Sequence, residues 1–146
     1  MADTQLIERR AVRVKIVEDT DSSAYRAFRC LQAGYILLPI LAGVDKFTRF
    51  MADWDMYLAS PVARMLPVRG DVFMYGVGVV EILAGLLVAI RPRIGAWVVA
   101  AWLCAIVVNL LLPPGYYDIA LRDIGLIFGA SALGLLARRF DVRRVS

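Results

Sequence analysis

Four apolar stretches, each long enough to cross a lipid bilayer, occupy most of this 146-residue chain. A helix needs about 20 mostly apolar residues to cross about 30 Å of hydrocarbon. The stretches run over 28–47, 72–90, 94–112 and 119–137. Apolar residues make up 60% of the sequence, which is more than a soluble domain of this size can bury. The sequence therefore predicts an all-α, integral membrane four-helix bundle.

Lys and Arg residues are distributed unevenly between the two sides that these spans define. Twelve lie near the two ends of the chain and in the turn at 91–93, and five lie on the other side. Cytoplasmic segments carry an excess of Lys and Arg. We therefore expect a multi-pass protein of the cytoplasmic (inner) membrane, with a polar tail (1–27) and a basic tail (138–146) in the cytoplasm. Because the basic residues flank the spans, a net charge of +4 requires no nucleic-acid partner.

Three segments outside the spans have patterns of their own. The alternation over 12–17 fits either a strand or an interfacial helix. The turn at 91–93 is short enough to require an antiparallel hairpin of the second and third spans. In the first outer loop, apolar residues recur at helical spacing over 50–58, opposite Asp53 and Asp55. This pattern predicts a short amphipathic interfacial helix on the outer membrane surface.

Four aromatic residues lie where the chain is expected to meet the membrane–water boundary. Trp and Tyr are enriched there because each combines an apolar ring with one polar group. We interpret the four as interfacial anchors, with ligand binding as the alternative. They are Trp54, Tyr57, Tyr116 and Tyr117.

The chain contains no histidine. This absence excludes haem held by His, the iron site built from two His and one carboxylate, and His-based zinc catalysis. The two cysteines, Cys30 and Cys104, lack metal-ligand spacing, and we expect both to be inert packing residues. No metal and no covalently bound cofactor is therefore predicted.

Six polar side chains lie inside the predicted spans, where each unpaired charge costs about 3 kcal/mol. At about 1.5 Å per residue, Glu81 lies near the bilayer midplane and Arg122 roughly 8 Å outward. We therefore predict that Arg122 pairs with Glu81, Asp123 or Asp45, and that Lys46 can meet Asp123. The full set is Asp45, Lys46, Glu81, Asn109, Arg122 and Asp123.

Small residues predict which faces of the spans meet. In the second span, Gly78 and Gly85 share the face of Glu81, and in the fourth, Gly125 and Gly129 share the face of Arg122. Small residues let helix backbones approach closely in lipid, so both charges are expected to point into the bundle. There they form either a latch that fixes helix packing or an outward-open polar pocket for a small molecule or quinone headgroup. An unpaired Glu81 would stay protonated and could exchange protons with a quinol.

Three segments resemble the DoxX-like superfamily of small four-helix membrane proteins, which includes the small subunit of thiosulfate:quinone oxidoreductase. They are 42–47 (AGVDKF), 80–87 (VEILAGLL) and 121–125 (LRDIG). The resemblance covers about 28–137 and implies a cytoplasmic-membrane protein found beside redox enzymes. Members often carry a histidine where Ala42 stands here, so this chain departs from them at one position linked to proton chemistry.

Because the sequence also lacks His, CxxC and a nucleotide-binding loop, we favour a non-catalytic membrane subunit or anchor of a redox enzyme complex, with a quinone or lipid pocket. Its expected partners are membrane lipid and a redox protein, and quinone is its only expected cofactor. The alternative is a subunit that itself reduces quinone, with Glu81 and Arg122 in the site. A small transporter is a third interpretation, which the lack of an inverted repeat or of paired broken helices disfavours.

Overall fold

The computed structural model describes residues 2–140, with side chains in 2–16 described only at positions 5, 10, 13 and 14. Residues 2–140 form five α-helices and one 3-10 turn and contain no strand, which confirms the predicted all-α fold. The elements are α1 (Ala2–Thr48), the 3-10 turn η1 (Trp54–Tyr57), α2 (Ser60–Met65), α3 (Gly70–Ile90), α4 (Pro92–Leu111) and α5 (Tyr117–Phe140).

Four of these helices are long and apolar enough to span a membrane. Helices α3, α4 and α5 match the last three predicted spans closely. In α1 the apolar part is Val17–Thr48, so the helix that contains the first predicted span starts far earlier than residue 28. The strand alternative for 12–17 is wrong because this segment continues a helix that begins at Ala2.

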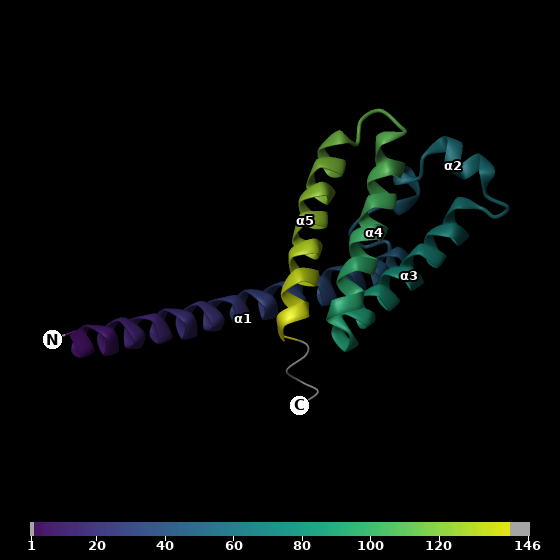
Figure 1. Ribbon diagram of the computed structural model, residues 1–146. Coiled ribbons are helices and arrows are strands. Elements are labelled where there is room, and N and C mark those ends of the chain that lie inside the picture. The colour runs from purple at the N-terminus through teal and green to yellow at the C-terminus, as the bar shows by residue number, and fades with distance from the viewer. Residues whose placement is uncertain (1, 141–146) are drawn as a thin grey trace.

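The four long helices form a closed ring: α1 packs on α3, α3 on α4, α4 on α5, and α5 again on α1. Helices α3 and α4 form the predicted hairpin, which turns at Arg91. Helix α1 runs obliquely to α4 and α5, and its first half extends away from the other helices (Figure 1). We call the end with η1, α2 and the α4–α5 connection the loop end, and the end with Arg91 the turn end.

Two apolar clusters fill the bundle. The larger lies toward the turn end and includes Phe28 of α1, Val88 of α3 and Leu133 of α5. The smaller lies toward the loop end, where Val107 of α4 packs with Ala120 of α5. The buried charged residues lie in α1, α3 and α5 on the loop-end side of the larger cluster, and we call them the polar layer: Asp45, Lys46, Glu81 and Asp123.

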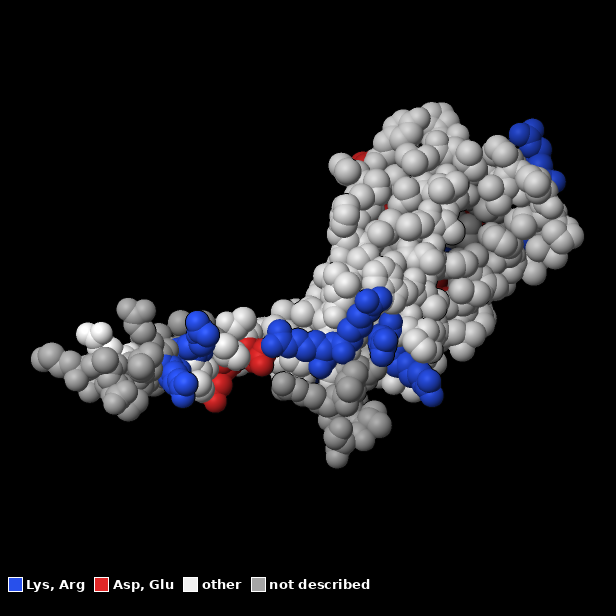
Figure 2. All heavy atoms as spheres, viewed as in Figure 1, with Lys and Arg blue, Asp and Glu red and all other residues white. Residues whose placement is uncertain are grey.

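The flank of the bundle is apolar. Large exposed side chains on each long helix include Leu41 (57% exposed), Leu83 (59%), Val108 (61%) and Phe128 (73%). On the face shown in Figure 2, Lys and Arg gather where α1 meets the turn end and at the tip of the loop end, and the flank between them is almost free of charge. A wide apolar surface of this kind needs lipid or another apolar partner.

The first loop contains less helix than its pattern predicts. Between Phe50 and Leu58 the chain forms the single 3-10 turn η1, and α2 follows at Ser60. The position of this loop on a membrane surface stays a prediction.

Candidate functional site

Helices α1 and α3 cross at two glycines. A Cβ atom on Gly43 would lie 2.6 Å from the carbonyl oxygen of Gly78, and one on Gly78 would lie 2.7 Å from that of Gly43. Only glycine fits at both positions, since the obstacle in each case is backbone. Lys46 and Glu81 each follow one of these glycines by three residues, so the crossing brings the two charged residues together.

Lys46 and Glu81 form a buried ion pair. The Lys46 ammonium donates to Glu81 Oε2 at 2.7 Å, and the two side chains are only 4% and 9% exposed. The prediction that Glu81 can pair with Arg122 is therefore wrong: its cation comes from α1, not α5. A pair this deeply buried depends on both partners, because either one alone would be an uncompensated charge.

An aromatic ring covers the pair on the side of the loop. The Lys46 ammonium lies 3.7 Å from the centroid of the Trp54 ring, a cation–π contact. The Trp54 indole N–H donates to Asp45 Oδ2 at 2.8 Å. Trp54, which was predicted as an interfacial anchor, thus covers the Lys46–Glu81 pair and belongs to the site.

Asp45 also orders the chain where α1 ends. Its Oδ1 accepts hydrogen bonds from the backbone N–H groups of Phe50 (3.0 Å) and Met51 (2.9 Å). The hydroxyl of Thr48 donates to the same oxygen at 3.1 Å. Arg49 takes the left-handed conformation (φ 53°) that ends the helix, and the Asp45 hydrogen bonds offset its strain. Both carboxylate oxygens of Asp45 therefore accept hydrogen bonds from the end of α1 and the loop that follows it.

Two further polar groups lie beside Glu81, and one of them has no hydrogen-bond partner. The buried indole N–H of Trp102 on α4 lies close to Glu81 but makes no hydrogen bond of standard geometry. Asp123 of α5 is 7% exposed and close enough to interact electrostatically with Glu81. The sequence analysis did not single out Trp102. The sequence feature that could have identified it is a Trp at the expected depth of the charged residue Glu81. A buried indole N–H usually has a hydrogen-bond partner, and a carboxylate can accept from it.

The prediction that Arg122 points into the bundle is wrong. Its side chain is 72% exposed, although its Nε forms an ion pair with Asp123 Oδ1 at 3.9 Å, so one of its three predicted pairings is found. A Cβ atom on Gly125 would meet nothing within 4 Å, whereas one on Gly129 would meet the Tyr35 side chain of α1, so this stripe of α5 contacts another helix at Gly129 but not at Gly125. Successive residues on a helix point about 100° apart, so the rotation that buries Asp123 turns Arg122 outward. The suggested pairing of Lys46 with Asp123 is also wrong, because Lys46 binds Glu81.

Asn109 belongs to the loop and not to the charged cluster. Its side-chain amide donates to the carbonyl oxygen of Tyr57 at 2.7 Å and accepts from the N–H of Ala59 at 3.1 Å. The rings of Tyr57 and Tyr116 pack edge to face at 5.3 Å. The side chains of Asn109, Tyr57 and Tyr116 thus hold the first loop against α4 and the start of α5. Tyr117 is 59% exposed, as an interfacial side chain would be.

The cysteines are free and exposed on α1 and α4. The expectation that Cys30 and Cys104 pack inside the protein is therefore wrong, because both lie on faces that no other helix covers. Within residues 2–140, no three His, Cys, Asp or Glu side chains come together as metal ligands would.

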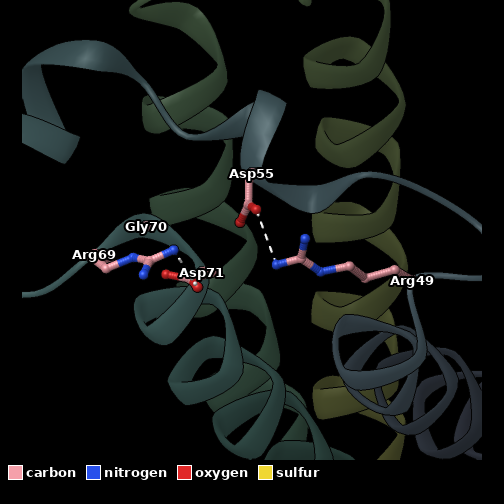
Figure 3. Close-up of a pocket in the computed structure, with 5 residues that line it drawn as sticks. All are labelled: Arg49, Asp55, Arg69, Gly70 and Asp71. Carbon is pink, nitrogen blue, oxygen red and sulfur yellow. Dashed lines mark ion pairs between the residues drawn. The ribbon is translucent and has the colours of Figure 1, made fainter.

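A charged pocket lies at the loop end, between the end of α1, η1 and the start of α3 (Figure 3). Its volume is about 460 Å³. Two ion pairs line it, Arg49–Asp55 at 3.0 Å and Arg69–Asp71 at 3.3 Å. The sequence analysis did not assign a site here, although these four charges flank the first loop.

Comparisons with known proteins found no family model that matches this chain, and no curated protein or solved structure with significant similarity to it. Within the chain itself, the charged groups described above fall into two sets. The Lys46–Glu81 pair and Asp45 are satisfied within the bundle and its first loop, whereas the Arg49–Asp55 and Arg69–Asp71 pairs lie at the partly exposed loop end.

Proposed function

We propose that this protein is a non-catalytic, DoxX-like subunit of the cytoplasmic (inner) membrane that anchors a redox enzyme. The observation that carries the proposal is the first part of α1, residues 2–19, which extends beyond the bundle as a helix (Figure 1). Arg10, Arg13 and Glu18 on it are exposed. A helix that projects in this way is a surface on which a second protein can dock.

The intramembrane polar layer supports the non-catalytic part of the proposal. Lys46 and Glu81 engage each other, and both oxygens of Asp45 accept hydrogen bonds from its own loop. Charged groups that are paired in this way fix which helices meet and leave little capacity for a substrate.

The distribution of basic residues over the two ends of the bundle supports the proposed orientation. The turn end carries more basic residues than the loop end, so it is placed in the cytoplasm. The first loop, with Trp54 and Tyr57, then lies at the outer surface as a short interfacial segment. The described basic residues of the turn end are Arg26, Arg29, Arg91, Arg93, Arg138 and Arg139, while Arg143 and Arg144 lie outside the described residues.

Reporter fusions test this orientation. A reporter placed ahead of α1 or after Ser146 is expected to give a cytoplasmic signal, because twelve of the seventeen Lys and Arg residues lie on that side. A reporter inserted after Met65, which is 85% exposed, is expected to report the outer side. A periplasmic signal from either end of the chain would contradict the four-span arrangement.

Site-specific photo-crosslinking tests the anchoring role. A crosslinking residue at Arg10 or Arg13 of the full chain, in its native membrane, is expected to capture an oxidoreductase that contains flavin, haem or an iron–sulfur cluster. The matched control is Arg64, an exposed arginine at the loop end, which is expected not to capture it. Capture from both ends alike, or capture only of proteins without a redox cofactor, would count against anchoring by α1.

Quinone reduction by the chain itself is the second candidate. The observation that favours it is the buried Trp102 indole N–H beside Glu81, which has no hydrogen-bond partner among the described residues, together with the nearby Asp123 carboxylate, which forms an ion pair with Arg122. A quinone carbonyl can accept a hydrogen bond from the indole, and the carboxylate can carry a proton. Quinone-reducing activity that stays with this chain after its captured partner is removed would favour this candidate over the anchor.

A further inference from the structure

The turn end of the bundle carries a concentrated positive charge. Figure 2 shows basic side chains gathered where α1 meets this end. The stretches 22–44, 82–117 and 124–140, parts of which form this end, contain no Asp or Glu, and Asp141 lies outside the described residues. All the described arginines of the turn end are exposed. They are Arg26, Arg29, Arg91, Arg93, Arg138 and Arg139.

Two of these six arginines have partners within the chain. Arg139 forms an ion pair with Asp21, and Arg29 donates to the side chain of Gln32 at 2.9 Å. The other four make no ion pair and no side-chain hydrogen bond with any residue that the structure describes. Exposed guanidinium groups without a carboxylate partner are suited to bind an oxyanion from outside the chain.

The packing of α4 on α5 brings two of these four arginines together. A Cβ atom on Gly134 would lie 2.8 Å from the indole nitrogen of Trp97, so the Trp97 ring lies directly against α5. Arg93 precedes Trp97 by one helical turn in α4. Arg138 follows Gly134 by one helical turn in α5. The two helices are antiparallel neighbours (Figure 1), and residues four apart share a helix face. Arg93 and Arg138 therefore lie at the same level, on the two edges that meet, and we call them the arginine pair.

The arginine pair favours a phosphate group. Two guanidinium groups at one level repel each other, and an anion that contacts both removes this repulsion. The planar set of N–H donors on each guanidinium matches the spacing of two phosphate oxygens. A phosphodiester has two such free oxygens and one negative charge, so it can accept from both arginines at once.

The surface next to the arginine pair is apolar. Toward the middle of the bundle, Ile94 is 49% exposed, Trp97 41% and Leu135 58%. These side chains belong to the apolar flank that all four long helices share. A phosphate held by the arginine pair would therefore lie directly beside a surface that fits acyl chains. Charge at the end of the bundle, next to an apolar flank, matches a phospholipid better than a soluble phosphate ester.

We propose that the arginine pair binds the phosphate of an anionic phospholipid in the cytoplasmic leaflet, of the phosphatidylglycerol type. Zwitterionic phospholipids carry the same phosphate, but their ammonium group would lie among the other arginines of the turn end and be repelled by them. The choice of leaflet rests on the orientation proposed above. The binding itself depends neither on that orientation nor on a redox partner.

Lipid titration of the full-length protein in detergent, read out by native mass spectrometry, tests the proposal. The probes are dioleoyl phosphatidylglycerol, dioleoyl phosphatidylethanolamine and dioleoyl phosphatidylcholine. We expect the glycerol lipid to bind at least about fivefold more tightly than the other two, because basic side chains favour net negative headgroups. Equal binding of the three lipids would overturn the proposal. Displacement by glycerophosphoglycerol, the same headgroup without acyl chains, at a concentration equal to that of the lipid would show that the ligand is a soluble phosphate ester.

Substitution of the arginine pair locates the binding. Arg93→Gln with Arg138→Gln is expected to abolish the preference for the glycerol lipid. The matched control is Arg26→Gln with Arg91→Gln, which removes the same charge from the same end outside the arginine pair and should keep most of the preference. Both double variants should fold, because neither removes an ion pair or a hydrogen bond. A preference that survives loss of the arginine pair, or that falls equally in both variants, would overturn the assignment. Crosslinking from Arg10 would still report on the anchor.

Discussion

Lys46→Met is expected to destabilise the bundle by about 3–5 kcal/mol, because it leaves Glu81 buried without its cation. Glu81→Gln is expected to have a cost of similar size, since the Lys46 ammonium then lies buried without a counter-charge. The double variant removes both charges, so its cost should be smaller than the sum of the two. The measurement is the free energy of unfolding by SDS titration in mixed micelles of one detergent.

Arg122→Gln is the matched control for this cycle. Arg122 is the sequence neighbour of the buried Asp123, but its own side chain is 72% exposed. Its ion pair with Asp123 is long and its own side chain exposed, so its removal should change the free energy of unfolding by about 1 kcal/mol or less. Strictly additive costs for Lys46 and Glu81, or a loss at Arg122 as large as theirs, would mean that the ion pair does not hold α1 to α3.

The second large effect is expected at the glycine crossing. Gly78→Val should reduce the free energy of unfolding by about 2–3 kcal/mol or more, because overpacking forces the surroundings to move. The atom in the way is the carbonyl oxygen of Gly43, 2.7 Å from the new Cβ. This oxygen is backbone and cannot rotate aside as a side chain would. The helices would have to separate, and Lys46 would then lose its contact with Glu81.

Gly76→Val separates this steric effect from helix propensity. Gly76 lies two residues away in the same helix, and a Cβ atom there would meet nothing within 4 Å. The change in backbone preference is the same, so Gly76→Val should be nearly neutral by SDS titration. Equal losses at both positions would show that close approach of α1 and α3 does not matter.

The membrane helices and their hairpin could be predicted from the sequence, because length and hydrophobicity alone decide whether a segment can span a bilayer. A connection as short as residues 91–93 can join the second and third spans only as an antiparallel hairpin. The depth of each charge was also predictable, since every residue adds about 1.5 Å along a helix axis. Depth placed Asp123 within reach of Glu81, as the structure shows, but it paired Lys46 with Asp123 and did not predict the Lys46–Glu81 pair.

Rotation of the helices was harder to predict. Asp123 and Arg122 are neighbours in the sequence, yet one is buried and the other is exposed. Gly125 gave a misleading signal, because a glycine can lie on an exposed face as well as at a contact. A better signal was a spacing that α1 and α3 share. In each helix a charged residue follows a glycine by three positions, Lys46 after Gly43 and Glu81 after Gly78, and the two charges have opposite signs. Two helices that cross at such glycines bring the two charges together.

The Lys46–Glu81 pair also has a consequence for membrane insertion during synthesis. The two residues are separated by 35 positions, which a ribosome translates in about 2–7 s at about 5–20 residues per second. During that interval the end of the first span carries a lysine whose counter-charge has not yet been made. We expect this end to remain at the lipid–water boundary until the helix with Glu81 arrives, so that the first two spans settle in the bilayer as a pair.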